Sequence, residues 1–555
     1  MAGGLLNIVS VGNNNQFLTG NPCKTFFKVT YSKYTNFGLQ KFRIDYSGLR
    51  ELRLTQPSEF NFKIPRYADL LMDTYLVVKL PDIWSPVWPP SITTNGLWVP
   101  YDFKWIENIG AQLIEEIEIT CGSTLIQKYS GEYLAAMVER DFTEDKKKLF
   151  NEMSGNTKNY NDPANGFGRD KAYPCASYTT SNLGAEPSIR GRNLYIPINT
   201  WFTLNSKCAF PLISLQYNEL NIKFRLRPIQ DLFRVRDPHD PDNDFPYVRP
   251  DFTLDRFQMY RFLQTPPSTY LYSADYENQI ATWNADVHLI STYCFLSEDE
   301  IRKFTAQDQV YLIKDIYQYK FENITGSRRL KVETNGMVSN WMWYLQRNDI
   351  KFRNEWANYT NWPYDNVPQN VSLAPIEVPS DVTQFDLSYG IGIHPTLTEN
   401  VLNSGIVITG DFYSGNRKEI LESFGILMNG EYRENMFHRG IYDYIEKYTR
   451  TPGNAKDGLY CYNFCLNTDP HEYQPSGAIN MNKFKNIELE VNTFIPAVDM
   501  SNSAFNVICD LSGNAIGIRK TNYQLYNYNY NLTLFEERYN VLSFVSGNCG
   551  MLYSR

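Results

Sequence analysis

Apolar and polar residues alternate along most of the chain with a period of two. This pattern puts every second side chain on one face of an extended segment, so it predicts half-buried β-strands. Helical patterns are few and short, and one of them begins with a capping box from Ser297 to Glu300. Many strands, few helices and long loops predict an all-β sandwich architecture. The clearest predicted strands are 26–31, 75–80, 116–120, 220–226, 287–294 and 539–545, and the predicted helices are 131–142, 297–305 and 434–448.

The sequence contains an internal echo. Segments 194–226 and 459–491 superpose at an offset of 265 positions, and each reads as a strand, a loop with a short helix, and a partner strand. The offset places Phe224 on Leu489, so the inward-facing alternation is kept in both copies. A further apolar strand follows each copy. Two copies of one sandwich explain this pattern, with chance similarity of short strands as the alternative.

The echo also predicts where the two halves join. The first copy lacks its last strand until 287–294, so residues 228–285 are interpreted as an insertion within the first domain. We therefore expect the following division: an N-terminal arm at 1–24, a first sandwich at 25–296, a connecting helix at 297–306 and a second sandwich at 307–555.

Composition narrows the function. Hydrophobic residues make up 43% and charged residues 21% of the 555 positions, which allows a large buried core. The formal net charge is −8. This net negative charge argues against direct binding of nucleic acid, because binding the phosphate backbone requires a basic surface.

The N-terminal segment suggests the compartment. No charged residue precedes Lys24, and Asn7 interrupts a short apolar run, so the basic region of a signal peptide is missing. The sequence contains no run of 18 or more apolar residues, so it predicts no membrane-spanning helix. We therefore expect a reducing compartment. The nine cysteines form no disulfide framework, and free, mostly buried thiols are expected.

Five motifs, in order, resemble one family: the major capsid proteins of nucleocytoplasmic large DNA viruses. Together they extend over nearly the whole chain, and their order makes the resemblance specific. The motifs are the opening segment 1–37, IPINTWFTLNSKCAFPLISLQYNELNI at 196–222, LISTYCFLSEDEIRKFT at 289–305, QPSGAINMNKFKN at 474–486 and YNVLSFVSGNCGML at 539–552.

The resemblance implies a double jelly roll, that is, two eight-stranded antiparallel β-sandwiches with short helices and long loop insertions. It implies a homotrimer that forms a pseudo-hexagonal capsomer in an icosahedral virion shell, assembled in the host cytoplasm. Neighbouring capsomers and minor capsid proteins beneath the shell would be partners, with an indirect association with an internal membrane. The arm would lie beneath the capsomer, and several long loops would form an outer tower. These loops are 81–108, 151–192, 228–285 and 347–400.

Enzymatic chemistry finds little support. The chain has five His and no metalloprotease, phosphate-loop, nucleophile-elbow or dinucleotide motif, so we expect no catalytic residues, no cofactor and no metal. Cys461 and Cys465 lie about 13 Å apart if they share a strand, which favours packing thiols over a metal site. The acidic run Asp240, Asp242, Asp244 and Asp251 resembles a calcium loop only faintly, because Phe245 replaces the required glycine.

Two other functions stay open. Four tryptophans cluster in one loop region and could stack sugars, as in a monomeric carbohydrate-binding sandwich, although burial of these rings is favoured. A minor or scaffolding capsid protein would share the fold without the abundance. The four tryptophans are Trp84, Trp88, Trp98 and Trp105.

Four sequons are candidate glycosylation sites: Asn323, Asn358, Asn370 and Asn531. A chain without a signal peptide would not meet the usual glycosylation machinery, so the motif carries little weight. Asn358 and Asn370 are expected in an exposed loop and are the better candidates.

Overall fold

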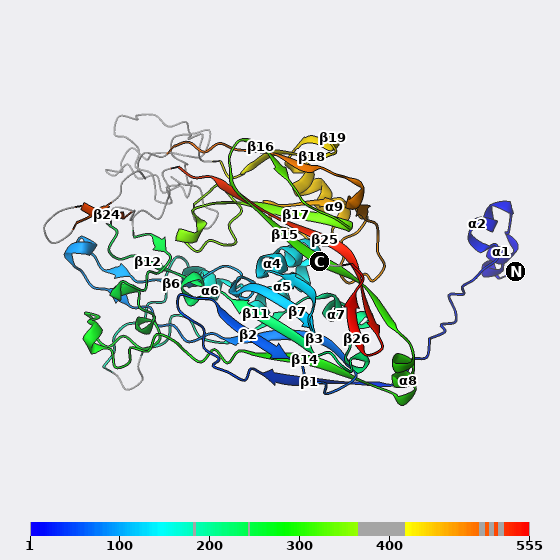
Figure 1. Cartoon of the computed structure of the whole chain (residues 1–555), viewed down its shortest axis with the longest axis horizontal. Coiled ribbons are helices and arrows are strands. Elements are labelled where there is room, and N and C mark those ends of the chain that lie inside the picture. Colours follow the sequence, from blue (N-terminus) through cyan, green and yellow to red (C-terminus); the bar gives the residue numbers. More distant parts are fainter. Residues whose placement is uncertain are drawn as a thin grey trace.

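Two β-sandwiches stacked side by side form the body of the protein in the computed structural model (Figure 1). Their strands run antiparallel throughout, and no strand of residues 37–296 pairs with a strand of residues 309–551 in the part of the chain that is described. The structure describes residues 2–180, 185–241, 245–363, 417–498, 506–509, 515–519 and 527–553.

The first sandwich pairs two sheets. One has the order β1-β14-β3, with β9 and β10 both beside β3, and the other has the order β2-β11-β7-β8. Alternate side chains of β2 and β11 point into the core, as their period of two predicts. The strands are β1 Phe37–Asp45, β2 Ser58–Lys63, β3 Leu70–Lys79, β7 Ile114–Cys121, β8 Thr124–Tyr129, β9 Asn193–Pro197, β10 Phe210–Pro211, β11 Leu220–Leu226 and β14 His288–Leu296.

The second sandwich repeats this arrangement. One sheet has the order β15-β25-β17-β20, with β21 beside β17 and β26 beside β25, and the other has the order β16-β22-β18-β19. The strands are β15 Gln309–Ile324, β16 Ser327–Lys331, β17 Met337–Arg347, β18 Leu421–Met428, β19 Glu431–His438, β20 Leu459–Asn463, β21 Ile479–Asn480, β22 Ile487–Thr493, β25 Tyr530–Val545 and β26 Asn548–Met551.

The internal echo is confirmed at the level of single side chains. Strand β9 lies beside β3 as β20 lies beside β17, and β11 and β22 are central strands of corresponding sheets. Phe224 of β11 and Leu489 of β22, which the offset superposes, are both fully buried. Two sandwiches with corresponding strand orders, of nine and ten described strands, are therefore the duplicated unit that the sequence predicts.

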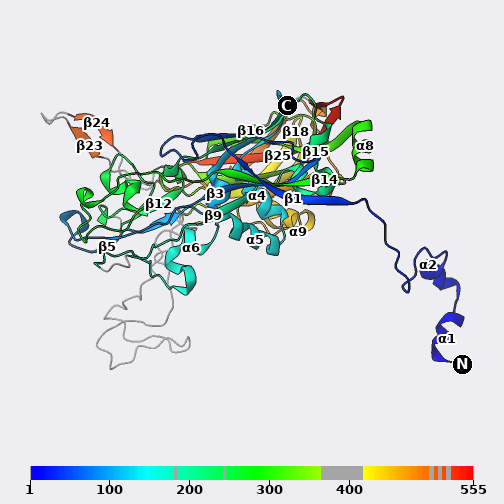
Figure 2. The same cartoon turned by 90° about the horizontal axis from the view of Figure 1, so that it is seen from below.

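The insertions 81–108 and 228–285 meet at one end of the body, at the left of Figures 1 and 2. Residues from 81–108 and 228–285 pair there in a small sheet of order β13-β12-β6. Its apolar residues join the core of the first sandwich. The strands at this end are β4 Val87–Trp88, β5 Val99–Pro100, β6 Phe103–Trp105, β12 Phe233–Arg236, β13 Tyr247–Val248, β23 Asn506–Cys509 and β24 Ala515–Arg519.

Two predicted helices are present. Helix α4 matches 131–142, and α8 matches 297–305 and follows Ser297, whose side chain makes no capping hydrogen bond, so that part of the capping-box prediction is wrong. The helices are α1 Gly3–Val9, α2 Gln16–Thr19, α3 Ile109–Leu113, α4 Gly131–Asp141, α5 Glu144–Ser154, α6 Lys158–Asn161, α7 Trp201–Leu204, α8 Glu298–Ala306 and α9 Glu446–Arg450. Among the described residues, no helix has both the length and the apolar character needed to cross a bilayer.

Two predicted elements are wrong. The helix predicted at 434–448 begins as strand β19, and only 441–450 is helical, because the edge of the β18 sheet pairs with the residues up to His438. The strand predicted at 26–31 is irregular chain. Phe27 is 98% exposed, and the segment pairs with no strand among the described residues.

The N-terminal residues form an arm that leaves the body at the end opposite the insertions (Figures 1 and 2). It carries α1 and α2 and reaches β1 through extended chain. All its large apolar side chains are exposed. Such a segment has no core of its own to bury them in.

Candidate functional site: the seam between the two sandwiches

Helix α4 lies between the two sandwiches (Figure 1). Ser130 caps it by accepting a hydrogen bond from the Tyr133 amide at 3.3 Å. Gly131 allows the close approach, because a Cβ there would lie 1.9 Å from the Ala111 carbonyl oxygen. Nearly every residue of the helix is buried, so its polar side chains need partners within the protein.

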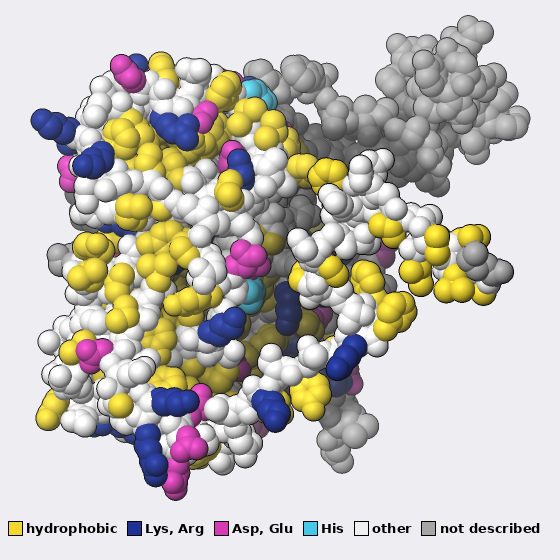
Figure 3. Space-filling view, turned by 90° about the vertical axis from the view of Figure 1, so that its right-hand side faces the viewer, with side chains coloured by type: hydrophobic (Ala, Val, Ile, Leu, Met, Phe, Trp, Pro, Cys, Tyr) yellow, Lys and Arg dark blue, Asp and Glu magenta, His cyan; other side chains and the backbone are white. Residues whose placement is uncertain are grey.

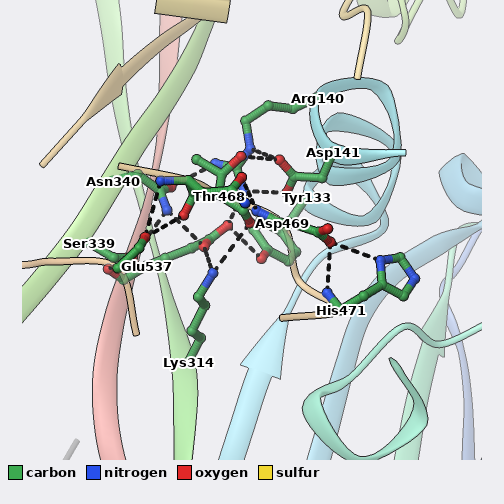
Figure 4. Close-up of polar contacts among 12 residues, drawn as sticks. Tyr133, Arg140, Asp141, Lys314, Ser339, Asn340, Thr468, Asp469, His471 and Glu537 are labelled. Atoms are coloured by element: carbon green, nitrogen blue, oxygen red, sulfur yellow. Dashed lines mark hydrogen bonds and ion pairs between the residues drawn. The ribbon is translucent and has the colours of Figure 1, made fainter. Parts of the chain in front are cut away.

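Arg140, near the end of α4, connects the two halves of the chain (Figure 4). Its guanidinium donates to both carboxylate oxygens of Asp141, at 2.8 and 2.6 Å. It also donates to Asn340 Oδ1 on β17 and to Glu537 Oε1 on β25, each at 2.6 Å. Arg140 is fully buried and Glu537 is 2% exposed, so the ion pair lies out of reach of solvent.

The remaining oxygens of this hub are also satisfied (Figure 4). Tyr133 OH donates to Glu537 Oε1 at 3.0 Å, and Asn340 Nδ2 donates to Glu537 Oε2 at 2.9 Å. Thr468 Oγ1 donates to Asp141 Oδ1 at 2.6 Å. Lys314 Nζ lies 3.6 Å from Glu537 Oε2. Within this hub, two cations thus face two carboxylates, so their charges balance.

The electrostatics favour an ionised Glu537. Burial alone would raise the pKa of this carboxyl, but the charges of Arg140 and Lys314, together with the hydrogen bonds from Asn340 and Arg140, lower its pKa to about 2. Burial and the nearby carboxylate charge raise the pKa of the Tyr133 phenol well above its ordinary value. Tyr133 therefore stays a neutral donor.

A second polar cluster surrounds Glu132, also on α4. Its carboxylate accepts from Arg227 Nη2 at 2.8 Å, from Gln318 Nε2 at 3.2 Å and from Tyr344 OH at 3.3 Å. Lys320 Nζ lies 3.5 Å away. Burial raises the pKa of Glu132, but the Arg227 and Lys320 charges outweigh it, so the pKa is lowered. Glu132, Tyr133 and Arg140 of one helix thus form hydrogen bonds that connect the two halves of the chain.

A third cluster joins the insertion 228–285 to the chain that follows β17. Arg234 of β12 forms a buried ion pair with Glu355. Asn354 Nδ2 donates to the carbonyl oxygens of Gln230 and Phe233, both at 2.8 Å. These contacts extend the seam towards the insertion end of the body.

Apolar contacts fill the space between the polar clusters. Tyr133 packs edge-on against Phe535 with ring centroids 5.6 Å apart, and Phe210 packs edge-on against Phe544 at 5.2 Å. One hydrophobic cluster contains both Ile44 and Cys549 and includes residues of both sandwiches. The seam is therefore a shared core, not a loose contact between separate domains.

Three of the four clustered tryptophans contribute to packing. Trp105 is fully buried and Trp88 is half-buried against Tyr101, with ring centroids 5.2 Å apart. Trp84 is half-buried and donates from Nε1 to the Ala185 carbonyl at 3.3 Å. Only Trp98 is largely exposed, at 56%. Burial is thus the main role of these rings, and a stacked platform for sugars is not formed by the four together.

The sequons lie in different environments. Asn358 is not exposed as predicted: it is 4% exposed, and its amide donates to Glu355 Oε2 and to the Trp362 carbonyl, both at 2.9 Å. Asn323 is exposed at the end of β15, and Asn531 on β25 accepts from its backbone amide at 3.3 Å. Asn370 lies outside the described residues.

The remaining candidates show no metal geometry. Cys461 and Cys465 are buried free thiols, and burial raises the pKa of Cys461 to about 12. Asp242 and Asp244 lie outside the described residues, so the acidic run is seen only in part. No group of three or more potential metal ligands occurs in the described ranges.

Sequence reasoning missed the hub because its partners are far apart in the chain. One signal was available: Glu536, Glu537 and Arg538 interrupt an otherwise uncharged strand, β25. Charges in the middle of a buried strand require partners. The identity of those partners depends on how the two halves stack, which no local pattern reports.

Comparisons with known proteins agree on one family. A model described as "Major capsid protein N-terminus" matches residues 25–250, and one described as "Large eukaryotic DNA virus major capsid protein" matches residues 300–550. The major capsid protein of Phaeocystis pouchetii virus is 22% identical over the full length of both chains. That of Paramecium bursaria Chlorella virus 1 is also 22% identical over both full lengths. That of Chrysochromulina ericina virus is 27% identical over 62% of this chain and 58% of its own.

Solved structures share the fold. A quasi-atomic model of the PBCV-1 virus capsid matches with a TM-score of 0.59 and 18% identity, covering 96% of this chain and all of the other. The Faustovirus major capsid protein matches with a TM-score of 0.58 and 11% identity, covering 93% and 92% of the two chains. These likenesses confirm the double jelly roll.

Proposed function

Because this chain belongs to the major capsid proteins of the large eukaryotic DNA viruses, we propose that three copies of it close into one pseudo-hexagonal capsomer. The protein is a structural, non-enzymatic component of the virion, and it forms the capsid shell with other copies of capsid protein. The trimer, its contacts beneath the shell and its assembly in the host cytoplasm are the parts that we propose.

The proposal rests on the seam between the two sandwiches. Two sandwiches with the same strand order are joined by a buried ion pair, Arg140 to Glu537, and by one hydrophobic core. Three such rigid pairs supply six similar units around one axis, which gives a ring with a nearly sixfold outline. The proposed domains are 25–296 and 307–555, with 297–306 as the connecting helix and 1–24 as the arm.

The arm suits contacts with other chains. It exposes Leu5, Phe17 and Leu18, among other large apolar residues, and no acidic residue precedes Asp45 in the chain. Figure 3 shows hydrophobic side chains gathered across the face that carries the arm. We propose that this face contacts neighbouring capsomers and minor capsid proteins beneath the shell, with any membrane association indirect.

The opposite end of the body suits the outer surface. The insertions at 81–108 and 228–285 fold against each other there, away from the arm. Their side chains are packed into the first sandwich, so they form a fixed extension of the body. With a net charge of −8, direct binding to the genome is not part of the proposal.

The experiment is a mass measurement on the purified full chain in native buffer. The chain mass is 64.6 kDa, so the expected particle is three times that, 193.8 kDa. A particle that stays at 64.6 kDa at micromolar concentration contradicts the trimer. The matched control is the Trp98→Ala variant, whose exposed ring lies outside the seam and should leave the mass of the particle unchanged.

A further inference from the structure

Two buried cysteines from opposite sandwiches meet at one end of the seam. Cys121 is the last residue of β7 and is fully buried, and Cys549 lies on β26 and is 6% exposed. Their side chains share a hydrogen bond. Both are free thiols in the same hydrophobic cluster.

The backbone around them holds the two strands together. The Gln216 amide donates to the Gly547 carbonyl at 3.0 Å, which fixes the β25–β26 turn against the loop before β11. On its other side that loop is tied to the β7–β8 turn, because the Gly122 amide donates to the Glu219 carbonyl at 2.9 Å. One loop thus clamps the turns next to both cysteines.

We propose that Cys121 and Cys549 form a disulfide that cross-links the two sandwiches once the protein meets an oxidising environment. The inference rests on the proposed function in one respect: a capsid protein made in a reducing cytoplasm later leaves the cell, where disulfides persist. No other pair among the eight cysteines described has its two side chains hydrogen-bonded to each other.

The two thiols are chemically unequal. The hydrogen bond with Cys549 and the positive charge of Arg66 lower the pKa of Cys121, although burial opposes this. The same hydrogen bond and burial raise the pKa of Cys549. The thiolate is the reactive form, and the Arg66 charge favours it at Cys121, so the reaction is written with Cys121 as the attacking thiolate.

With hydrogen peroxide as the oxidant, the reaction balances in two steps. The Cys121 thiolate attacks one peroxide oxygen, the O–O bond breaks, and a sulfenic acid and hydroxide result. The Cys549 sulfur then attacks the Cys121 sulfur, the S–O bond breaks, and the displaced oxygen leaves as water. Together two thiols lose two electrons and two protons, and one peroxide becomes two waters. Peroxide is small, so it reaches a buried pair more readily than a larger disulfide oxidant does.

The bond would close a long loop. The two cysteines are separated by most of the chain, and cross-links across long loops restrict the unfolded state most strongly. We therefore expect the melting temperature of the oxidised chain to exceed that of the reduced chain by a few degrees.

The test uses the full-length wild-type chain, purified under reducing conditions and then treated with hydrogen peroxide or left reduced. We expect a loss of about 2 Da and a proteolytic peptide pair that joins Cys121 to Cys549 and separates on reduction. The Cys549→Ser variant should lose both this pair and the rise in melting temperature. Cys465→Ser, at a buried thiol without a thiol partner, should keep both.

Two outcomes would overturn the cross-link: both thiols remaining open to alkylation in the denatured, peroxide-treated chain, or Cys121 and Cys549 pairing with other cysteines. Because mapping is done on the single chain, its result is independent of particle mass. A 193.8 kDa particle without the cross-link contradicts this inference alone, whereas a cross-linked 64.6 kDa chain contradicts only the proposed trimer.

Discussion

Arg140 and Glu537 lie 397 positions apart in the sequence, yet Arg140 Nη2 and Glu537 Oε1 are 2.6 Å apart in the buried seam. One belongs to a helix of the first half and the other to the central strand β25 of the second. A contact of this kind needs both halves to be correctly folded and correctly stacked. It therefore makes the seam, and not only each sandwich, a feature that the sequence specifies.

Removing one partner of this pair should be costly. In Glu537→Ala, Arg140 keeps Asp141 and Asn340 but loses the carboxylate on β25, and we expect a loss of about 3–5 kcal/mol in the free energy of unfolding. Denaturant titration of the full chain measures it. The matched control is Glu333→Ala, whose side chain is 82% exposed and should cost less than about 0.5 kcal/mol. Equal effects of the two variants would contradict a buried hub.

Stability should fall in acid through the same residue. The pKa of Glu537 is about 2 in the folded chain and 4.5 in the unfolded reference. The unfolded state therefore takes up the proton first, and the stabilisation is complete above pH 4.5 and is lost as the pH falls towards 2. This difference corresponds to a contribution on the order of 3 kcal/mol. Melting temperatures of wild type and Glu537→Gln between pH 6 and pH 3 check it, since the variant should show a shallower decline.

The shared core predicts cooperative unfolding. Phe224→Ala in the first sandwich and Leu489→Ala in the second each remove a fully buried side chain at equivalent positions. Each should cost about 2–5 kcal/mol. Leu489 lies in a separate cluster inside the second sandwich, but that sandwich also contributes Phe535 and Leu542 to the cluster that contains Phe224, so we expect both variants to shift the same single transition. Calorimetry reports the number of transitions. Two separate transitions, each sensitive to one variant, would show that the sandwiches unfold independently.

The arm should be dispensable for folding. In the described structure, the arm and the irregular chain that joins it to β1, together residues 2–36, bury no large apolar side chain and contribute none of the seam hydrogen bonds. A chain without them should keep the wild-type melting temperature and far-ultraviolet spectrum but associate less readily into shells. A large loss of stability on truncation would mean that the arm packs on its own body.

Glycan occupancy should follow exposure. The side-chain amide of Asn358 donates two hydrogen bonds to groups inside the protein, whereas Asn323 is exposed at a strand end. If the chain is expressed through a secretory pathway, we expect mass spectrometry to find sugar on Asn323 and none on Asn358. A modified Asn358 in folded protein would contradict its placement.

Much of the fold was predictable because sandwich strands carry a local signature. The alternation in 220–226 and its echo in 487–491 predict two central strands with the correct inward faces, and both are confirmed. The motifs of 131–142 and 297–305 likewise predict α4 and α8. These elements are set by periodicity within a few residues, which a sequence displays directly.

The errors have a different origin. Residues 26–31 have the pattern of a strand, but a strand forms only with a partner, and the described part of the chain offers none to this segment. Residues 434–438 have a helical pattern, but pairing with β18 outweighs it. Asn358 was expected in a loop on the surface, and long-range contacts with Glu355 and Trp362 bury it. In each case the outcome depends on what lies beside the segment.

The most direct test of the account is an image of the purified particle by single-particle electron microscopy. If two like sandwiches per chain are joined rigidly through the Arg140–Glu537 seam, the particle should show six sandwich-sized densities in a closed ring, in three identical pairs. Isolated pairs of densities, or sandwiches that vary in their spacing from one particle to the next, would contradict it.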